Sequence, residues 1–128
     1  MGHLFIDGGT NPRNHFCFFF GTKLIRNFEG KFIKQVRLTN AGSDVVPVPA
    51  GFAFSPDAKQ QFLYVVDSGP MRVVIFDRAM MTQIGVIGMK GKNPGEFDIV
   101  HHMAADSKGN LYTGEIVNNR RAQRFVLK

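Results

Sequence analysis

The chain has 128 residues, of which 44% are hydrophobic and 20% are charged, and its formal net charge is +6. This length and balance suit one folded domain with its own core and exclude an intrinsically disordered chain. The positive charge favours anionic partners in general, but the basic residues are spread along the sequence and do not single out nucleic acid.

Neither export nor membrane insertion is indicated. No apolar run approaches the roughly 20 residues of a membrane-spanning helix, so we expect no membrane association. The first residues, MGHLFIDGG, have no basic start, long apolar core or cleavage site, so the cytoplasm is the default location. The single cysteine, Cys17, excludes an internal disulfide, and within HFCFFF we expect a buried, unreactive thiol.

The predicted elements are short β-strands in three successive groups. The first group comprises GHLFID at 2–7, HFCFFF at 15–20, KLIRNF at 23–28 and KFIKQVRL at 31–38. The second comprises GFAFSPD at 51–57, FLYVVD at 62–67, MRVVIF at 71–76 and QIGVI at 83–87. The third has three strands, HMAAD at 102–106, LYTGE at 111–115 and RAQRFV at 121–126. No window keeps a helical apolar period for three turns, so the chain is predicted to be all-β.

Two landmarks repeat at nearly the same spacing. An aspartate ends the first strand of each group, at separations of 50 and 49 residues: Asp7, Asp57 and Asp106. We expect each of these carboxylates to accept N–H groups of the turn that follows it. A phenylalanine ends each third strand, at separations of 48 and 49 residues: Phe28, Phe76 and Phe125.

These spacings define three repeats within a single domain, at approximately 2–38, 51–87 and 101–128. A repeat of 40–50 residues with four antiparallel strands is typical of a β-propeller blade. The third repeat ends after its third strand, so its edge beside 121–126 is predicted to be filled by another strand, most simply an N-terminal one.

The last repeat resembles the NHL repeat. The matching features are a glycine-rich loop ending in Gly-x-Phe, a histidine-containing strand entry, a DSKGNLY turn, an acidic residue and an Arg-x-Gln-x-Phe strand. They correspond to Gly95 to Phe97, His101 and His102, Asp106 to Tyr112, Glu115, and Arg121 to Phe125. The middle repeat fits more loosely and the first repeat least, since HFCFFFGTK replaces the expected strand and acidic residue.

This resemblance implies a six-bladed β-propeller and a range of functions. Some proteins with NHL repeats are similar to the metal-dependent lyase that cleaves peptidyl-hydroxyglycine. Others bind RNA or proteins on one face. A shared fold does not select among these functions.

Three blades cannot close a propeller ring, because the two outermost blade faces would remain bare. We therefore expect a half-propeller completed by homodimerisation, in which two chains supply six blades. A piece of a longer propeller, or a truncated gene product, is the alternative interpretation.

The loops at one end of such a fold form a candidate binding rim. These loops are predicted at 39–50, 67–71, 88–101 and 115–120. Loops on a rigid frame commonly carry binding residues. The predicted ligand-binding residues are Asp67, His101, His102, Glu115, Arg120 and Arg121.

The two adjacent histidines are weak candidates for metal binding. Imidazoles can hold zinc or another transition-metal ion. Neighbouring strand residues point to opposite faces, however, so at most one ring is expected to face a central channel. His3 occupies the same position in the first repeat as His102 does in the third, whereas Phe52 replaces the histidine at this position of the middle repeat. We favour histidines that hydrogen-bond the loop, and we assign no cofactor.

Asp67 and Glu115 occupy equivalent ends of second strands. We expect them to accept N–H groups of the following loop or to pair with Arg72 and Arg121, rather than to act as catalytic carboxylates. The segment 88–95, GMKGKNPG, could cradle a phosphate, but it lacks the strand-to-helix context of such loops, and we expect an ordinary connecting loop.

The sequence contains no nucleophile elbow, P-loop, dinucleotide fingerprint or cysteine-pair zinc motif, and we assign no catalytic residue. The favoured function is a non-enzymatic binding scaffold that presents its rim to a protein or small ligand. A metal-dependent lyase or hydrolase and an RNA-binding surface are the alternatives.

Overall fold

A computed structural model describes residues 14–19, 22–27, 32–39, 44–126 and 128. Ten β-strands and their connections make up this part of the chain, and it contains no helix, so the all-β prediction is confirmed. It follows that no described helix has the length and hydropathy needed to cross a membrane.

The first sheet contains three antiparallel strands in the order β1-β2-β3. These are β1 (Asn14–Phe19), β2 (Thr22–Asn27) and β3 (Phe32–Arg37), and they match the predicted second to fourth strands of the first repeat. The predicted strand at 2–7 lies outside the described residues, as does the environment of the Cys17 side chain.

The middle sheet contains four antiparallel strands in chain order, as predicted. They are β4 (Pro49–Phe54), β5 (Phe62–Asp67), β6 (Arg72–Asp77) and β7 (Thr82–Ile87). The interior strand β5 has the sequence FLYVVD and is buried along almost its whole length. A continuous apolar run suits this position, because both faces of the sheet are covered there.

Alternate residues of β5 supply two separate hydrophobic cores. Leu63 and Val65 point to one face and join a cluster with Phe52, Val74, Phe76, Met81 and Leu38, the last of which directly follows β3. Tyr64 and Val66 point to the other face and join a cluster with Ala53, Val73, Phe97, Val100 and Leu111. The period-2 geometry of a strand thus lets one sheet pack against a neighbour on each side.

The third sheet contains three antiparallel strands in the described residues. They are β8 (Val100–Ala105), β9 (Leu111–Glu115) and β10 (Ala122–Phe125), in the order β8-β9-β10. Strand β8 begins two residues before the predicted start, and β10 is one residue shorter than predicted at each end.

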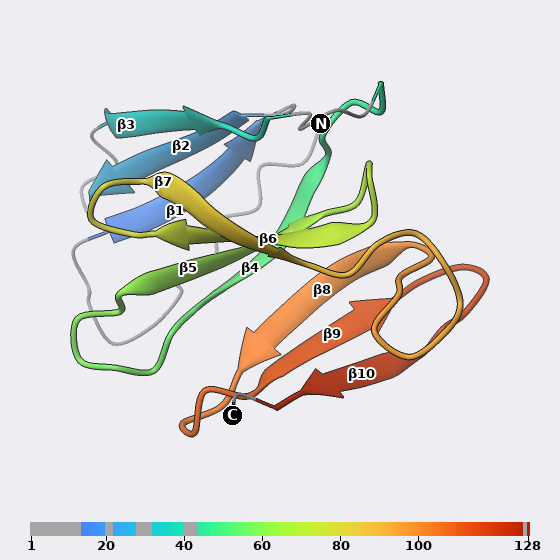
Figure 1. Ribbon diagram of the computed structural model, residues 1–128. Helices are drawn as coiled ribbons and strands as arrows, with labels where there is room; N and C mark the ends of the chain where they lie inside the picture. Colours follow the sequence, from blue (N-terminus) through green and yellow to red (C-terminus); the bar gives the residue numbers. More distant parts are fainter. Residues whose placement is uncertain (1–13, 20–21, 28–31, 40–43, 127) are drawn as a thin grey trace.

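The sheets follow one another in sequence order, with the middle sheet between the other two (Figure 1). The first strands of the second and third sheets, β4 and β8, are in contact. Gly51 permits this approach, because a Cβ atom there would lie 2.9 Å from the carbonyl oxygen of His101 and 3.0 Å from the Cα atom of His102. This arrangement is the frame on which the loops are held.

Candidate functional site

The four predicted rim loops meet at one end of the sheets, on the right of Figure 1. The N–H of Ser68 donates to the carbonyl of Val48 at 2.8 Å, and its hydroxyl donates to the carbonyl of Val100. The N–H of Ile116 donates to the carbonyl of Ile99 at 2.9 Å. These bonds join each loop to a neighbour, so the described parts of the four loops form one continuous rim.

A buried ion pair fastens the rim at the middle sheet. Asp67 ends β5 and Arg72 begins β6, directly opposite it in the strand pairing. The Nε of Arg72 lies 3.0 Å from Oδ2 of Asp67, whose side chain is fully buried. The second carboxylate oxygen accepts the N–H of Val48 at 2.7 Å, and the Arg72 guanidinium donates to the carbonyl of Thr39 at 2.6 Å. The pair therefore holds both ends of the loop that precedes the sheet.

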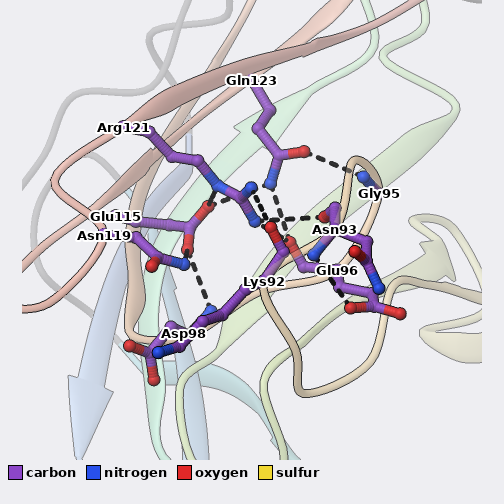
Figure 2. Close-up of polar contacts among 9 residues, drawn as sticks. All are labelled: Lys92, Asn93, Gly95, Glu96, Asp98, Glu115, Asn119, Arg121 and Gln123. Carbon is purple, nitrogen blue, oxygen red and sulfur yellow. Dashed lines mark hydrogen bonds and ion pairs between the residues drawn. The ribbon is translucent and has the colours of Figure 1, made fainter.

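An equivalent pair fastens the rim at the third sheet (Figure 2). Glu115 ends β9, and its Oε1 lies 2.6 Å from the Nε of Arg121. The other oxygen accepts the N–H of Asp98 at 2.9 Å and the side-chain amide of Asn119 at 3.0 Å. The amide of Gln123 also donates to Oε1, at 2.9 Å. We call these two ion pairs, Asp67–Arg72 and Glu115–Arg121, the acid–arginine clamps.

The second clamp closes the loop before the third sheet through its backbone carbonyls. The guanidinium of Arg121 donates to the carbonyls of Lys92, Asn93 and Glu96, at 2.7, 3.2 and 2.7 Å. Gln123 donates to the same Glu96 carbonyl at 2.8 Å and accepts the N–H of Gly95 at 2.9 Å. One arginine and one glutamine thus satisfy three carbonyls and one N–H group of this loop.

Hydrogen bonds stabilise the charged form of Glu115. Burial opposes its ionisation, but the donors from Arg121, Asp98, Asn119 and Gln123 together outweigh burial and lower the pKa of Glu115 below its ordinary value of 4.5. Glu115 is therefore a structural anion rather than a proton donor near neutral pH.

The predicted arginine pairing of both carboxylates is confirmed, but the predicted source of the backbone donors is wrong. We expected N–H groups of the loop that follows each strand. The donors, Val48 and Asp98, belong instead to the loop that precedes each sheet. Strand ends lie beside that earlier loop only after the sheet has formed, so local sequence does not reveal this contact.

Two residues of the second clamp were not predicted, Asn119 and Gln123. A sequence signal existed for Gln123, because Arg121 and Gln123 are two apart on one strand and therefore share a face. In the middle repeat Val74 occupies the position equivalent to Gln123 and lies in the core, so the middle sheet has no counterpart of this glutamine contact.

The two histidines are placed differently from the prediction. In the pairing of β8 with β9, Val100 lies opposite Glu115 and His102 opposite Gly114, so His101 is an extra residue in a β-bulge. The rings of His101 and His102 therefore lie side by side, with centroids 4.4 Å apart and Nδ1 atoms 3.1 Å apart. The expectation that adjacent rings point to opposite faces is wrong, because it assumes an unbroken strand.

The remaining predicted positions have local roles. Arg120 is exposed, and its guanidinium donates to the carbonyl of Val117 in its own loop. Asp57 and Asp106 accept turn N–H groups, as predicted, whereas Asp7 lies outside the described residues. The N–H of Gly91 is bonded to the carbonyl of Phe97, and that amide is not directed at an anion.

The structure therefore brings together Glu115 with Arg121, and His101 with His102. Asp67 belongs to the separate clamp, and no hydrogen bond within the described residues joins it to Glu115. The described residues contain no group of three or more histidine, cysteine, aspartate or glutamate side chains arranged to hold a metal ion. His3 lies outside them.

Comparison with models of protein families gave no match. Comparison with curated proteins gave no match either.

Proposed function

We propose that this chain is a non-enzymatic binding scaffold that presents its loop rim to a protein or small ligand. The observation that carries the proposal is the exposure of large apolar side chains on three of the four rim loops. Exposed apolar residues that gather in one region, rather than singly, mark interaction surfaces. Those on the rim are Val45, Val46 and Val48, Met89, and Ile116 and Val117.

The backbone of one rim residue supports this assignment. Val117 is 55% exposed and has a φ of +67°, a conformation that is strongly disfavoured for a β-branched residue. Such conformations persist where the surrounding structure holds them and are concentrated at binding sites. Here the loop is held by Asn119 and Arg121 through Glu115. Val117 is thus presented to solvent on a fixed loop.

The clamps give the rim the rigidity that a binding surface benefits from. They place fully buried carboxylates beneath exposed loops, so the loops are ordered before any ligand arrives. A preorganised loop loses less conformational entropy on binding than a mobile one. A rigid, partly apolar rim suits a partner that presents its own apolar side chains.

We further propose that the three sheets are propeller blades and that a second copy completes the ring. The support comes from two equivalent tyrosines. Tyr64 of the middle sheet is 5% exposed because the third sheet covers it, whereas Tyr112, at the equivalent position of the third sheet, is 38% exposed. The open surface, which we call the end face, consists of His102, Ala104, Tyr112, Ala122 and Arg124.

Affinity capture with a rim variant tests the binding proposal. The variant Val46→Ser/Met89→Ser removes two side chains that are 69% and 65% exposed and contribute to neither core. The control Ile84→Ser/Val86→Ser removes two exposed apolar side chains of β7, away from the rim. We expect partners, identified by mass spectrometry, that the wild type and the control retain and that the rim variant loses.

Two results would contradict the proposal. Equal capture by all three proteins would show that the rim is not the binding surface. Retention of RNA alone, weakening steeply as salt is added, would favour a surface that binds phosphates over an apolar rim.

A further inference from the structure

The two histidines at the start of β8 meet through their Nδ1 atoms, which lie 3.1 Å apart. The bulge at His101 produces this arrangement, since it turns the ring of an extra residue towards that of its neighbour.

The separation of the two nitrogen atoms matches the spacing of two ligands on one metal ion. Bonds of about 2.0–2.1 Å from each Nδ1 to a shared ion would give an N–metal–N angle of roughly 100°. This angle lies between the values of octahedral and tetrahedral sites, both of which transition metals adopt in proteins. The pair therefore needs little rearrangement to bind an ion.

The surroundings leave room for the remaining ligands. In the row of residues across the sheet, His102 is followed by Gly114 and Ala122, neither of which has a side chain larger than a methyl group. His102 itself is exposed and His101 is half-buried. In a single chain, an ion held by the two rings would thus be open to water or to a ligand on one side.

Metal binding competes with the hydrogen bond between the two rings. In that bond one Nδ1 donates its proton to the other. Binding therefore requires the donating ring to carry its proton on Nε2 instead.

We propose that the Nδ1 atoms of His101 and His102 chelate a divalent transition-metal ion, with Cu²⁺ bound more tightly than Zn²⁺. The order follows from the general affinity of imidazole for these ions. Water or a bound ligand fills the other coordination positions, because the described residues offer no third protein ligand. This site is distinct from the apolar rim and does not depend on it. His102 also belongs to the end face, so in the proposed dimer the second copy would lie beside the ion.

Calorimetric titration of the full chain with Cu²⁺ and with Zn²⁺ tests the chelate. Wild type is compared with His101→Ala, His102→Ala and the control His15→Ala on β1. A chelate predicts one ion per chain and a loss of about tenfold or more in affinity for either single pair variant. His15→Ala should bind as wild type does, and circular dichroism checks that every variant is folded.

Nitrogen-15 NMR of the histidine rings identifies the ligating atoms. We expect Zn²⁺ to shift the Nδ1 resonances of both His101 and His102. Shifts confined to Nε2 atoms would show independent surface imidazoles and overturn the proposal. So would the absence of saturable binding by wild type, or binding that neither pair variant weakens.

Discussion

At the scale of single residues, the acid–arginine clamps explain why two charged side chains stand at the ends of otherwise apolar strands. Each carboxylate side chain is fully buried, and each receives both a guanidinium and a backbone N–H. A buried charge with these partners is tolerated, whereas the same charge without them would favour unfolding. The clamps therefore make the loops part of the folded core.

The two clamps should respond differently to loss of the arginine. Arg72→Met leaves Asp67 fully buried with one backbone donor, so we expect a loss of about 3–5 kcal/mol in the free energy of unfolding. Arg121→Met leaves Glu115 with three donors and should cost less, about 1–3 kcal/mol. Urea denaturation measures both, with the exposed Lys108→Met, which lies outside the end face, as control. Equal losses for the two variants would contradict this account.

Acid stability should depend on Glu115. Its pKa is lowered in the folded state, so the unfolded chain binds more protons at mildly acidic pH and stability falls with the pH. The contribution is complete above the ordinary value of 4.5 and disappears as the pH falls through the lower folded value. We expect the urea midpoint of Glu115→Gln to change less between pH 5 and pH 3 than that of wild type. Equal changes in the urea midpoints of Glu115→Gln and wild type between pH 5 and pH 3 would exclude this role.

At the scale of elements, the strands and turns follow from local chemistry, and the contacts between sheets do not. The residues of β5 and β6 are mostly β-branched or aromatic and prefer a pleated surface. Asp106 and Gly109 favour the turn that they occupy. The bulge at His101 depends on how β8 meets β9, so an alternating pattern predicted the wrong ring orientation.

The close approach of β4 and β8 provides a test at this scale. A Cβ atom at Gly51 would meet only backbone atoms, at 2.9–3.0 Å, and backbone atoms of two packed sheets cannot move aside readily. We expect Gly51→Ala to lower the free energy of unfolding by about 1–3 kcal/mol.

Gly85→Ala on β7 is the matched control, since its Cβ atom would make an ordinary 3.5 Å contact with the Ile75 side chain. It should be neutral or stabilising by about 0.5–1 kcal/mol. Thermal or urea unfolding distinguishes the two variants. A harmless Gly51→Ala would mean that the sheets are further apart in solution.

At the scale of the whole molecule, the end face lacks the neighbouring sheet that covers each face of the middle sheet. The middle sheet has a neighbour on each face, and its buried clusters are continuous with both. The end face presents equivalent positions to solvent, including Tyr112. A second copy that packs its first sheet there would extend the same interface.

The assembly proposal predicts the mass of the particle. Light scattering at micromolar concentration should give twice the 14.3 kDa of one chain. Tyr112→Lys should shift this mass towards a single chain, because it places a charge in the proposed interface. Ile84→Lys, at a similarly exposed apolar residue of β7, should leave the mass unchanged. A wild-type mass of 14.3 kDa would contradict the proposal.

The sequence by itself determined the all-β class, most strand positions, the turn aspartates and the arginine partners of Asp67 and Glu115. These depend on residue preferences and on short, repeated spacings. Tertiary structure alone decided which loop the clamps hold, how Gln123 joins one of them, and that the two histidine rings face each other. Each of these features depends on contacts between segments distant in sequence or on an irregularity in a strand. Neither the strand propensity of the residues nor the period of the apolar pattern contains that information.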